Sequence, residues 1–563
     1  MPTYPTLNEL FETSVKRFAD NVALRMLIPT ERKKGRGVQL VLNEITYSRL
    51  GETVGRLAAA LQHLGVQKGD RVALVSKPRA AYAMALFAVL RCGAAVLPLD
   101  PDLQRGELKR ILEEAGVSAA IFSGSKAEDL AAIRSESLPD MSLVCMDRTT
   151  MEGIEFMDAV VLGHRPVASI PVTQDDLAIL MYTSGTTGNA KGAMLTHRNI
   201  ASNALTAIKV VELSERDNFL TIVPWYHIYG LTITLMCPVA VGATTTYTPV
   251  DRNLMQVMHR ARPTLILGVP KLYNVLYERV RAGIQKSALK RAIAKTSPTL
   301  MGKLLVRKLF GKQFRFFTSG GAPLNPEAAA GFRRMGIGIL EGYGLTETAP
   351  LLTASDLFAE GPGMAPIEDI EIKILDPGED GVGEVLARGP NIMAGYYKNP
   401  GATAEVIDDE LWFHTGDLGL IRDGNLVLSG RAKNVIVLET GKNVYPEELE
   451  WEFNGIPAIE EIMVYEDERQ GIPVVSALVY PSDAALKKLG ITNKDDALEH
   501  IWEEIRKANE NLAMFKRIRY KECIRLVDEP FEKSVKLDIK RHKVKVAVQQ
   551  EAPSGDPAPS EDS

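Results

Sequence analysis

The chain has 563 residues, of which 45% are hydrophobic and 24% charged, and its formal net charge is −5 at pH 7. This length exceeds what one hydrophobic core can support, so we expect at least two domains. So small a net charge argues against nucleic acid as a general partner. The four cysteines lie far apart without a C-x-x-C pair, which suits a reducing compartment and gives no signal for a zinc or disulfide framework.

The N-terminal residues have neither a basic start nor an apolar core, so we expect no secretory signal and a cytoplasmic location. Residues 226–250 contain one histidine and no Asp, Glu, Lys or Arg, which is compatible with a membrane span. Their threonines, their glycines and Pro238 favour instead an internal helix that runs into a buried strand.

Residues 46–120 alternate between helical and strand patterns. Apolar residues recur at helical spacing from Tyr47 to Leu64, and residues 71–75 form a short buried-strand run. A second helix is expected at 80–90, followed by a second apolar run at 94–99. This alternation predicts a parallel sheet with helices on its faces.

Residues 279–315 carry eleven Lys or Arg and no Asp or Glu. A solvated pair of helices is one interpretation of this basic segment. The other is peripheral contact with anionic lipid at the inner face of a membrane while an acyl chain is collected.

Strand patterns dominate beyond residue 360, at 370–375, 384–388 and 426–429, with turn residues between them. A compact unit of strands and helices is expected from about Lys433 onward. Residues 551–563 have no apolar residue beyond Ala, so we expect disorder there.

The strongest local signal is the segment from Tyr182 to Gly192, Tyr-Thr-Ser-Gly-Thr-Thr-Gly-Asn-Ala-Lys-Gly. Its glycines allow sharp turns that expose backbone N–H groups, its Ser and Thr residues add hydroxyl donors, and Lys191 adds a positive charge. Such a loop suits a polyphosphate. It is not a Walker A loop, because Lys191 is followed by Gly192 rather than by Ser or Thr.

Four further segments follow this loop in order, namely Ser319-Gly-Gly-Ala-Pro-Leu324, Tyr343-Gly-Leu-Thr-Glu-Thr348, Thr415-Gly-Asp-Leu-Gly419 and Gly430-Arg-Ala-Lys-Asn-Val-Ile-Val437. Together the five segments resemble the signature of the adenylate-forming superfamily over roughly residues 5 to 545. Within it, the segment Gly441-Lys-Asn-Val-Tyr-Pro-Glu-Glu-Leu-Glu450 and the basic segment look most like bacterial long-chain fatty acyl-CoA synthetases.

This resemblance implies an α/β fold with a large N-terminal domain, residues 1–432, of doubly wound sheets plus a small distorted β-barrel. A small mobile α+β domain, residues 433–546, and a disordered tail, residues 547–563, would follow. The implied activity is AMP-forming ligation of a medium- to long-chain fatty acid to coenzyme A, a substrate, with ATP and Mg²⁺. An acyl-AMP would form first and the CoA thiol would then attack it, so no protein nucleophile is required.

The resemblance also assigns residues. Catalytic roles fall on Thr186, Lys191, His227, Thr346, Glu347 and Lys536, and Glu347 would bind the metal. Tyr343 would lie against adenine, and Asp417 would accept hydrogen bonds from the ribose hydroxyls. Contacts to the nucleotide or coenzyme A would come from Thr183, Ser184, Gly185, Thr187, Gly188, Gly320, Ala322, Pro323, Gly342, Tyr343, Gly344, Asp417, Arg431, Lys433 and Gly441. Lys433 would be the hinge about which the small domain rotates between the two half-reactions.

One departure from the family pattern concerns the C-terminal lysine that contacts the carboxylate and the α-phosphate during adenylation. The gapless match, Glu532-Lys-Ser-Val-Lys-Leu-Asp-Ile-Lys-Arg541, places Asp538 there, and a carboxylate would repel phosphate. Lys536 is our expected substitute, with Lys540 as the alternative. Two other functions stay open, a ligase that donates to a carrier protein and a catalytically weak acyl- and nucleotide-binding homologue.

Overall fold

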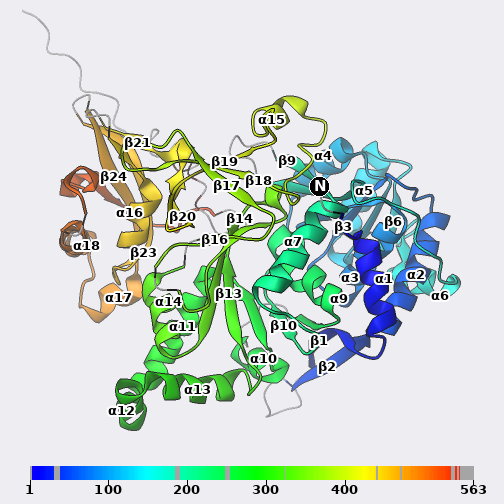
Figure 1. Ribbon diagram of the computed structural model, residues 1–563, viewed down its shortest axis with the longest axis horizontal. Helices are drawn as coiled ribbons and strands as arrows, with labels where there is room; N and C mark the ends of the chain where they lie inside the picture. The colour runs from blue at the N-terminus through cyan, green and yellow to red at the C-terminus, as the bar shows by residue number, and fades with distance from the viewer. Residues whose placement is uncertain are drawn as a thin grey trace, which may run out of the picture. The chain divides into compact units, whose positions relative to one another are not determined.

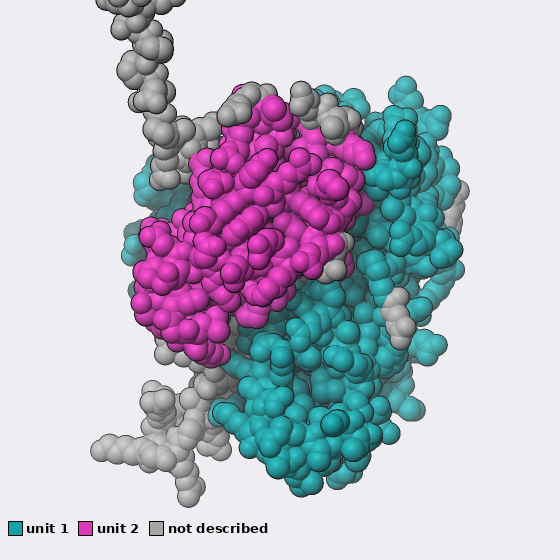
Figure 2. Space-filling view, turned by 90° about the vertical axis from the view of Figure 1, so that its left-hand side faces the viewer, with its two compact units in different colours: residues 1–185, 189–415, 419–428 teal, residues 186–188, 416–418, 429–563 magenta. Residues whose placement is uncertain are grey.

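The computed structural model describes residues 3–30, 39–183, 190–247, 254–322, 324–359, 361–438, 442–469, 472–510 and 512–533, together with residues 539, 541 and 544. Its chain divides into two compact units, which Figure 2 colours separately. The first extends from the N-terminus to residue 428, apart from short segments such as 416–418, which belong with residues 429–563 to the second.

A seven-stranded sheet in the first unit has the order β7-β6-β5-β3-β4-β8-β9. Figure 1 labels its strands β3, β6 and β9. Its strands are β3 Arg71–Val75, β4 Ala95–Leu99, β5 Ala119–Phe122, β6 Ser142–Cys145, β7 Glu155–Phe156, β8 Leu177–Thr183 and β9 Lys191–Thr196. All neighbours are parallel except β8 and β9, which form an antiparallel hairpin. The helices are α1 Leu7–Arg17, α2 Tyr47–His63, α3 Ala80–Arg91, α4 Arg105–Ala115, α5 Ala127–Ser137 and α6 Met157–Gly163.

Strand β3 shows why this sheet forms. Val72 and Leu74 belong to the apolar core that includes α2 and α3, whereas Ala73 and Val75 belong to the core that includes α4 and α5. Successive side chains of a strand point to opposite faces, so a strand covered by helices on both sides is a continuous apolar run. The parallel sheet predicted for residues 46–120 is confirmed.

The second sheet has nine strands in the order β16-β15-β14-β13-β12-β10-β11-β1-β2. Its strands are β1 Val22–Thr30, β2 Gln39–Thr46, β10 Asn218–Thr221, β11 Thr244–Tyr247, β12 Leu265–Gly268, β13 Phe316–Gly320, β14 Gly338–Gly344, β15 Leu351–Ala354 and β16 Ala365–Pro366. Strands β1 and β10–β14 are parallel, and both edges are antiparallel. Its helices are α7 His197–Val210, α8 Ile228–Leu231, α9 Cys237–Val241, α10 Leu254–Ala261, α11 Pro270–Gln285, α12 Ala288–Thr296, α13 Pro298–Leu309 and α14 Pro326–Arg334.

The apolar stretch is internal over its described residues, 226–247, as predicted. Helix α8 continues through a π-helical turn at Thr232–Met236 into α9, and the chain then enters strand β11. In the described part of the chain, no helix is long and apolar enough to cross a membrane. The basic segment contains the end of α11 and the helix pair α12 and α13. Ser287 caps α12, and Ser297-Pro298 begins α13.

The region expected as a small barrel is a four-stranded sheet in the order β17-β18-β19-β20. Its strands are neighbours in the same order in which they occur along the chain. Its strands are β17 Glu371–Leu375, β18 Gly383–Arg388, β19 Phe413–Arg422 and β20 Asn425–Arg431, with α15 Pro400–Ala404 between β18 and β19. The strands predicted at 370–375, 384–388 and 426–429 are therefore confirmed.

The second unit packs helices against a three-stranded sheet, β23-β24-β25. Its elements are β21 Ile436–Val437, β22 Asn443–Val444, α16 Pro446–Phe453, β23 Ile459–Arg469, β24 Ile472–Pro481, α17 Asp483–Lys488, α18 Lys494–Asn509 and β25 Ile524–Leu526. Leu449 and Phe453 of α16, Val464 of β23 and Ile501 of α18 lie in one apolar core. This is the α+β arrangement expected of the small domain.

Candidate active site

The hairpin of β8 and β9 holds the two ends of the predicted phosphate loop. Thr183 pairs with Lys191 in the antiparallel register, and the Thr183 hydroxyl donates to the Lys191 carbonyl oxygen over 3.3 Å. Several predicted site residues lie outside the described residues, namely Ser184, Gly185, Thr186, Thr187, Gly188, Pro323, Gly441 and Lys536. The described ends of the loop nevertheless place Lys191 at the carboxyl end of β8.

Lys191 and Glu347 both contact the same tyrosine, Tyr396. The Lys191 Nζ lies 5.0 Å from the centre of the Tyr396 ring, and the Tyr396 hydroxyl donates to Glu347 Oε1 over 2.9 Å. Tyr396 is buried, and its burial and the neighbouring Glu347 carboxylate raise the pKa of the phenol well above its usual value. Tyr396 therefore remains a hydrogen-bond donor that holds Glu347 in a fixed orientation beside a cation.

Glu347 sits on a short 3-10 turn, Thr346–Thr348, that buried hydrogen bonds hold rigid. The hydroxyl of Thr348 accepts from the Leu345 N–H over 2.9 Å, and the Thr348 carbonyl oxygen accepts from the Asn391 side-chain amide over 2.7 Å. The Met393 N–H donates to the Glu347 carbonyl oxygen over 2.8 Å. A rigid support of this kind is what a residue that must face a charged ligand requires.

Strands β13 and β14 bring two further motifs to one edge of the nine-stranded sheet. Gly320 and Gly342 are register partners at the carboxyl ends of these parallel strands. A Cβ on Gly320 would lie 3.1 Å from Cζ of Tyr229 and 3.3 Å from the Gly342 carbonyl oxygen. A side chain at position 320 would crowd Tyr229, so glycine keeps this edge open. Tyr343 follows on β14, and Ala322 is half-buried just after β13.

His227 precedes α8 and its ring packs edge-on against Tyr226, with ring centres 4.8 Å apart. The Tyr226 hydroxyl hydrogen-bonds Asp100, the residue after β4; burial raises the pKa of the Asp100 carboxyl. Two residues beyond His227, the Tyr229 hydroxyl donates to the Thr318 hydroxyl over 3.5 Å. The aromatic-histidine segment and the glycine motif at 319–324 are thereby brought together.

In the second unit, Asp417 and Arg431 form an ion pair, with Oδ1 2.6 Å from Nε. The Asp417 side chain is only 8% exposed, whereas that of Arg431 is 40% exposed. Desolvation, followed by the neighbouring Arg431, lowers the pKa of Lys433. The three described contacts predicted in this unit, Asp417, Arg431 and Lys433, therefore form one electrostatic group around the turn at Ala432–Asn434.

Tyr229 and Tyr396 are the residues that the motifs did not single out. Tyr229 lies in the same segment as His227, Pro224-Trp-Tyr-His-Ile-Tyr-Gly230. Its aromatic side chain directly before Gly230 is the feature of the sequence that could have identified it. Tyr396 stands in Ala394-Gly-Tyr-Tyr-Lys398, nearly fifty residues beyond Glu347, and nothing local relates the two positions.

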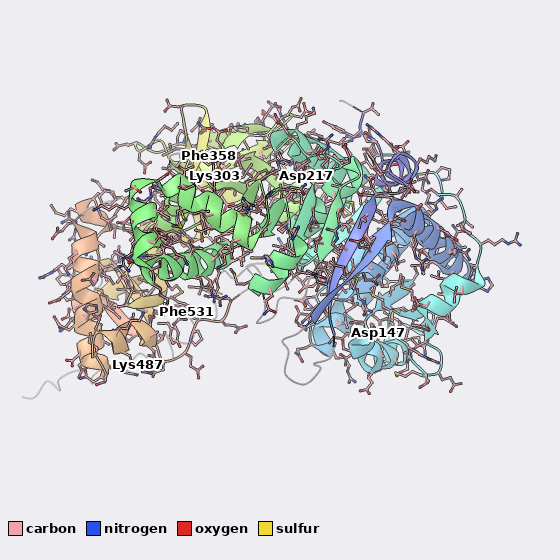
Figure 3. All side chains as sticks on the ribbon, turned by 90° about the horizontal axis from the view of Figure 1, so that it is seen from below. Asp147, Asp217, Lys303, Phe358, Lys487 and Phe531 are labelled. Carbon is pink, nitrogen blue, oxygen red and sulfur yellow. The ribbon has the colours of Figure 1, made fainter. Side chains whose placement is uncertain are left out.

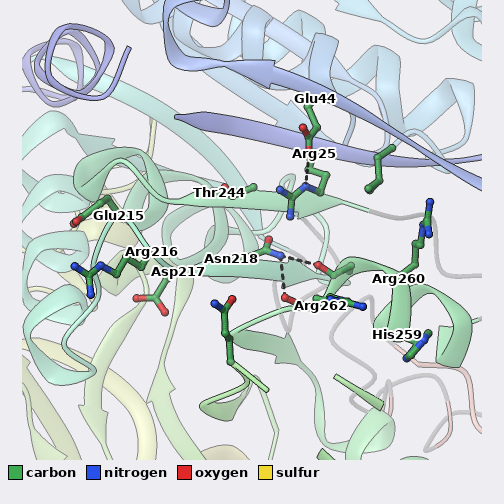
Figure 4. Close-up of a pocket in the computed structure, with 13 residues that line it drawn as sticks. Arg25, Glu44, Glu215, Arg216, Asp217, Asn218, Thr244, His259, Arg260 and Arg262 are labelled. Atoms are coloured by element: carbon green, nitrogen blue, oxygen red, sulfur yellow. Dashed lines mark hydrogen bonds and ion pairs between the residues drawn. The ribbon is translucent and has the colours of Figure 1, made fainter. Parts of the chain in front are cut away.

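A cavity of about 540 Å³ lies elsewhere, where β10 and β11 begin at Asn218 and Thr244 (Figure 4). Asn218 donates there to the Ala261 and Arg262 carbonyl oxygens, and Arg25 pairs with Glu44. None of the predicted site residues lines this cavity, whose charged wall is unsuited to an apolar chain. Gly320 and Gly342 of the same sheet lie instead toward the carboxyl ends of β13 and β14, the edge at which parallel α/β sheets bind ligands.

Comparison with known proteins agrees with this geometry. Residues 11–397 match the AMP-binding enzyme family, and residues 433–552 match the AMP-binding enzyme C-terminal domain. The chain is 31% identical over 546 residues to a long-chain-fatty-acid–CoA ligase of Salmonella typhimurium, covering 88% of this chain and 87% of the relative. It is also 31% identical over 455 residues to a feruloyl-CoA synthase of an Amycolatopsis species, covering 78% and 84%.

Solved structures share the fold. The anthranilate CoA ligase AuaEII in complex with anthranoyl-AMP aligns with a TM-score of 0.80 at 21% identity, covering 98% of both chains. The ATP-bound MatB of Rhodopseudomonas palustris aligns with a TM-score of 0.76 at 25% identity, covering 97% and 99%. Matched over most of its length in sequence and in fold, the chain is a member of the AMP-binding enzyme family, within the adenylate-forming superfamily of acid–thiol ligases.

Proposed function

We propose that this chain activates a medium- to long-chain fatty acid with ATP and transfers the acyl group to coenzyme A. The observation that carries this proposal is the match to the Salmonella typhimurium ligase, which spans 88% of the chain. The feruloyl-CoA synthase match has the same identity but covers 78%. An aromatic acid such as ferulate is therefore the second candidate substrate.

The proposed mechanism uses the described residues as follows. Lys191 supplies positive charge toward the phosphates of ATP, and Thr346 presents its hydroxyl toward the α-phosphate that the acid attacks. His227 lies beside the acyl carboxylate. Asp417 binds the ribose hydroxyls, and Arg431 and Lys433 contact the same nucleotide. The acid oxygen bonds the α-phosphorus as pyrophosphate leaves, and the CoA sulfur then bonds the acyl carbon as AMP leaves.

Mg²⁺ belongs to this proposal, with Glu347 as its protein ligand. The geometry fits, because Mg²⁺ in nucleotide sites is commonly held by one or two carboxylates plus phosphate oxygens. Tyr396 holds the Glu347 carboxylate through a hydrogen bond to Oε1. The ion, when bound, offsets the negative charge of the leaving pyrophosphate. Among the described residues no cluster of three or more metal-ligating side chains occurs, which agrees with a site completed by the nucleotide.

A graded panel of acids tests the substrate. Purified protein is given ATP, Mg²⁺ and CoA with fatty acids from octanoate to stearate, with ferulate and with benzoate, and AMP release is measured. We expect kcat/KM to be highest for a fatty acid. A higher value for ferulate would overturn the fatty acid assignment. Pyrophosphate exchange without thioester formation on free CoA would point to a carrier-protein acceptor. Absent pyrophosphate exchange would point to the catalytically weak homologue.

Peripheral contact with an anionic membrane at the cytoplasmic face is the second part of the proposal. Between residues 286 and 312 the chain has eight Lys or Arg and no acid, and the nearby ion pairs of described residues involve only Arg281 and Arg315. Leu289, Leu300 and Leu304 on α12 and α13 are 70%, 48% and 50% exposed. Figure 3 labels Lys303, which lies on α13 with Leu300 and Leu304. Exposed leucines among unpaired cations suit an anionic bilayer surface.

Sedimentation with lipid vesicles tests this contact. We expect the protein to sediment with phosphatidylglycerol vesicles and not with phosphatidylcholine vesicles. The double variant Leu289→Glu, Leu304→Glu should abolish sedimentation, whereas Leu162→Glu should not, although Leu162 on α6 is 78% exposed. Equal sedimentation of all three proteins, or none with either lipid, would overturn the membrane contact.

A further inference from the structure

Exposed arginines border the cavity at the start of β10 and β11. The cavity has a volume of about 540 Å³, and every residue that lines it belongs to the first unit. Its buried lining residues include Asp217, Asn218 and Ala261, and its exposed ones include Arg216, Arg260 and Arg262. In Figure 4, Arg216 and Arg260 lie on opposite sides of Asn218. The cavity therefore has a buried floor and opens to solvent between arginines.

Two of the three carboxylates that line the cavity are already paired with arginine. Glu44 Oε1 lies 2.8 Å from Nε of Arg25. Nη1 of Arg315 donates to both oxygens of Asp217, over 3.1 and 2.9 Å. Glu215, the third carboxylate, makes no ion pair in the described part of the chain. Because an adjacent cation largely cancels the field of a carboxylate, the floor presents little negative charge to a ligand.

The three exposed arginines are not paired in this way. Among the described residues, none of their guanidinium groups makes a hydrogen bond or an ion pair. Helix α10 accounts for Arg260, since a cation in the last turn of a helix compensates its dipole. It does not account for Arg216, which lies on the turn before β10. Segments more than forty residues apart thus bring uncompensated cations to one cavity.

Arg262 is held at the cavity by its backbone and by its stem. Its φ of +46° is in the left-handed region, which is uncommon for a residue other than glycine and is concentrated at ligand sites. The Asn218 side-chain amide donates to the Arg262 carbonyl oxygen over 3.3 Å. A Cβ on Gly311 would lie 3.6 Å from Cγ of Arg262, so the stem lies close to that glycine. The surrounding structure therefore fixes where this guanidinium group is presented.

The basic segment adjoins the same cavity. Gln313 lines it, and His259 Nδ1 lies 2.9 Å from the Lys308 carbonyl oxygen. Residues 303–315 carry five Lys or Arg and no acid. A concave surface surrounded by charge of one sign attracts ligands of the opposite sign.

We propose that this cavity binds a small molecule that carries phosphate groups, at a site separate from the nucleotide site. Guanidinium groups bind phosphate oxygens through paired N–H bonds, and three of them converge here. Small-molecule sites commonly have volumes of about 300–1,000 Å³, so the cavity admits a sugar phosphate. Glu215, Thr244 and Gln313 supply hydrogen-bonding groups for its hydroxyls. The inference is independent of the proposed function, because binding requires no turnover.

Calorimetric titration with fructose 1,6-bisphosphate tests the site, and fructose is the matched probe without phosphate. We expect the bisphosphate to bind, fructose not to bind, and added NaCl to weaken binding. Equal binding of the two sugars would overturn the proposal, because the cavity would then recognise hydroxyls rather than phosphate.

The double variant Arg216→Gln, Arg262→Gln removes two cations that come from different segments. We expect the Kd of the bisphosphate to rise at least about tenfold, as for lost hydrogen bonds to a charged group. The control variant Arg334→Gln, Arg422→Gln removes the same charge from exposed positions on α14 and β19, and its Kd should equal that of the parent. Arg216→Gln alone, which leaves the strained backbone at Arg262 untouched, should raise the Kd in the same direction. An unchanged Kd in both cavity variants would place the probe elsewhere.

The phosphate group has two possible sources, a free metabolite and a lipid headgroup. Sedimentation with phosphatidic acid vesicles separates them, because this lipid presents a phosphomonoester at the membrane surface. Vesicle binding that the double cavity variant abolishes, without binding of the bisphosphate, would assign the cavity to a lipid headgroup. Bisphosphate binding that the same variant weakens would assign it to a free metabolite. If neither probe depends on the cavity arginines, the proposal is wrong, whether or not the protein forms acyl-CoA.

Discussion

At Glu347 the candidate site depends on a neighbouring phenol as much as on the carboxylate. Tyr396 bridges Lys191 and Glu347, which come from different segments. Tyr396→Phe keeps the ring but removes the donor to Glu347. Loss of a hydrogen bond to a charged group costs about 1.5–3 kcal/mol, which corresponds to roughly 10- to 100-fold in adenylation rate if the contact persists in the transition state. Pyrophosphate exchange measured across a Mg²⁺ titration checks this.

Tyr397→Phe is the control for this prediction. The Tyr397 hydroxyl donates to the Ala115 carbonyl oxygen over 3.4 Å, away from Glu347. Its loss should leave the exchange rate and the Mg²⁺ midpoint unchanged. If Tyr396→Phe behaves like Tyr397→Phe, the phenol does not orient Glu347.

His197 predicts a pH dependence of stability. Its Nδ1 accepts from the Leu7 N–H over 3.1 Å, and burial lowers the pKa of the imidazole from 6.5 to about 4. The folded state therefore disfavours the protonated ring. The neutral ring therefore contributes about 3 kcal/mol to the free energy of unfolding. This contribution is fully present above pH 6.5 and is lost as the pH falls toward 4. Urea unfolding of the parent between pH 7.5 and 4.5, about the range of the shift, measures it.

His197→Gln supplies the comparison, because glutamine can accept from Leu7 but does not titrate. Between those two pH values the free energy of unfolding should fall less in this variant than in the parent. Identical slopes would show that another group causes the acid sensitivity.

At the scale of elements, the end of helix α9, which follows the π-helical turn, leaves no room for a side chain. Helix α9 stops at Gly242, whose φ of +76° is left-handed, and a Cβ there would lie 2.2 Å from the Phe18 ring. Gly242→Ala should lower the free energy of unfolding by about 2–4 kcal/mol, from backbone strain plus overpacking. Gly65→Ala is the control, because Gly65 has φ +93° but nothing within 4 Å of its Cβ position. Urea unfolding should show the smaller loss there, and equal losses would mean that the Phe18 ring moves aside.

The sequence predicts elements better than it predicts contacts between them. Apolar runs such as Arg71–Val75 identify buried parallel strands because both faces of the strand are covered. Motifs at strand ends, such as Gly320 and Gly342, come together because parallel strands share a carboxyl edge. Tyr396 could not be placed in this way, because its position beside Glu347 depends on the tertiary path of a connection between strands β18 and β19.

At the scale of the whole molecule, the chain consists of two units joined near residue 428. The turn Ala432–Asn434 follows β20, a few residues into the second unit. It carries Lys433 next to Asn434, whose side-chain amide donates to Glu447. A short turn with charged neighbours is a suitable hinge, since few residues need to change φ and ψ for a domain to rotate. The proposed two-step reaction requires such a rotation between its halves.

Lys433→Pro tests the hinge, because proline fixes φ near −65° and restricts the turn. We expect adenylation, measured by pyrophosphate exchange, to persist if the fixed turn retains the first conformation. Thioester formation from synthetic acyl-AMP should fall roughly a hundredfold, because the CoA-binding geometry would not assemble. Lys433→Ala removes the same charge without restricting φ, so it should retain thioester formation much better than Lys433→Pro. Similar losses in both half-reactions of Lys433→Pro, with an unchanged Tm, would place the hinge at another residue.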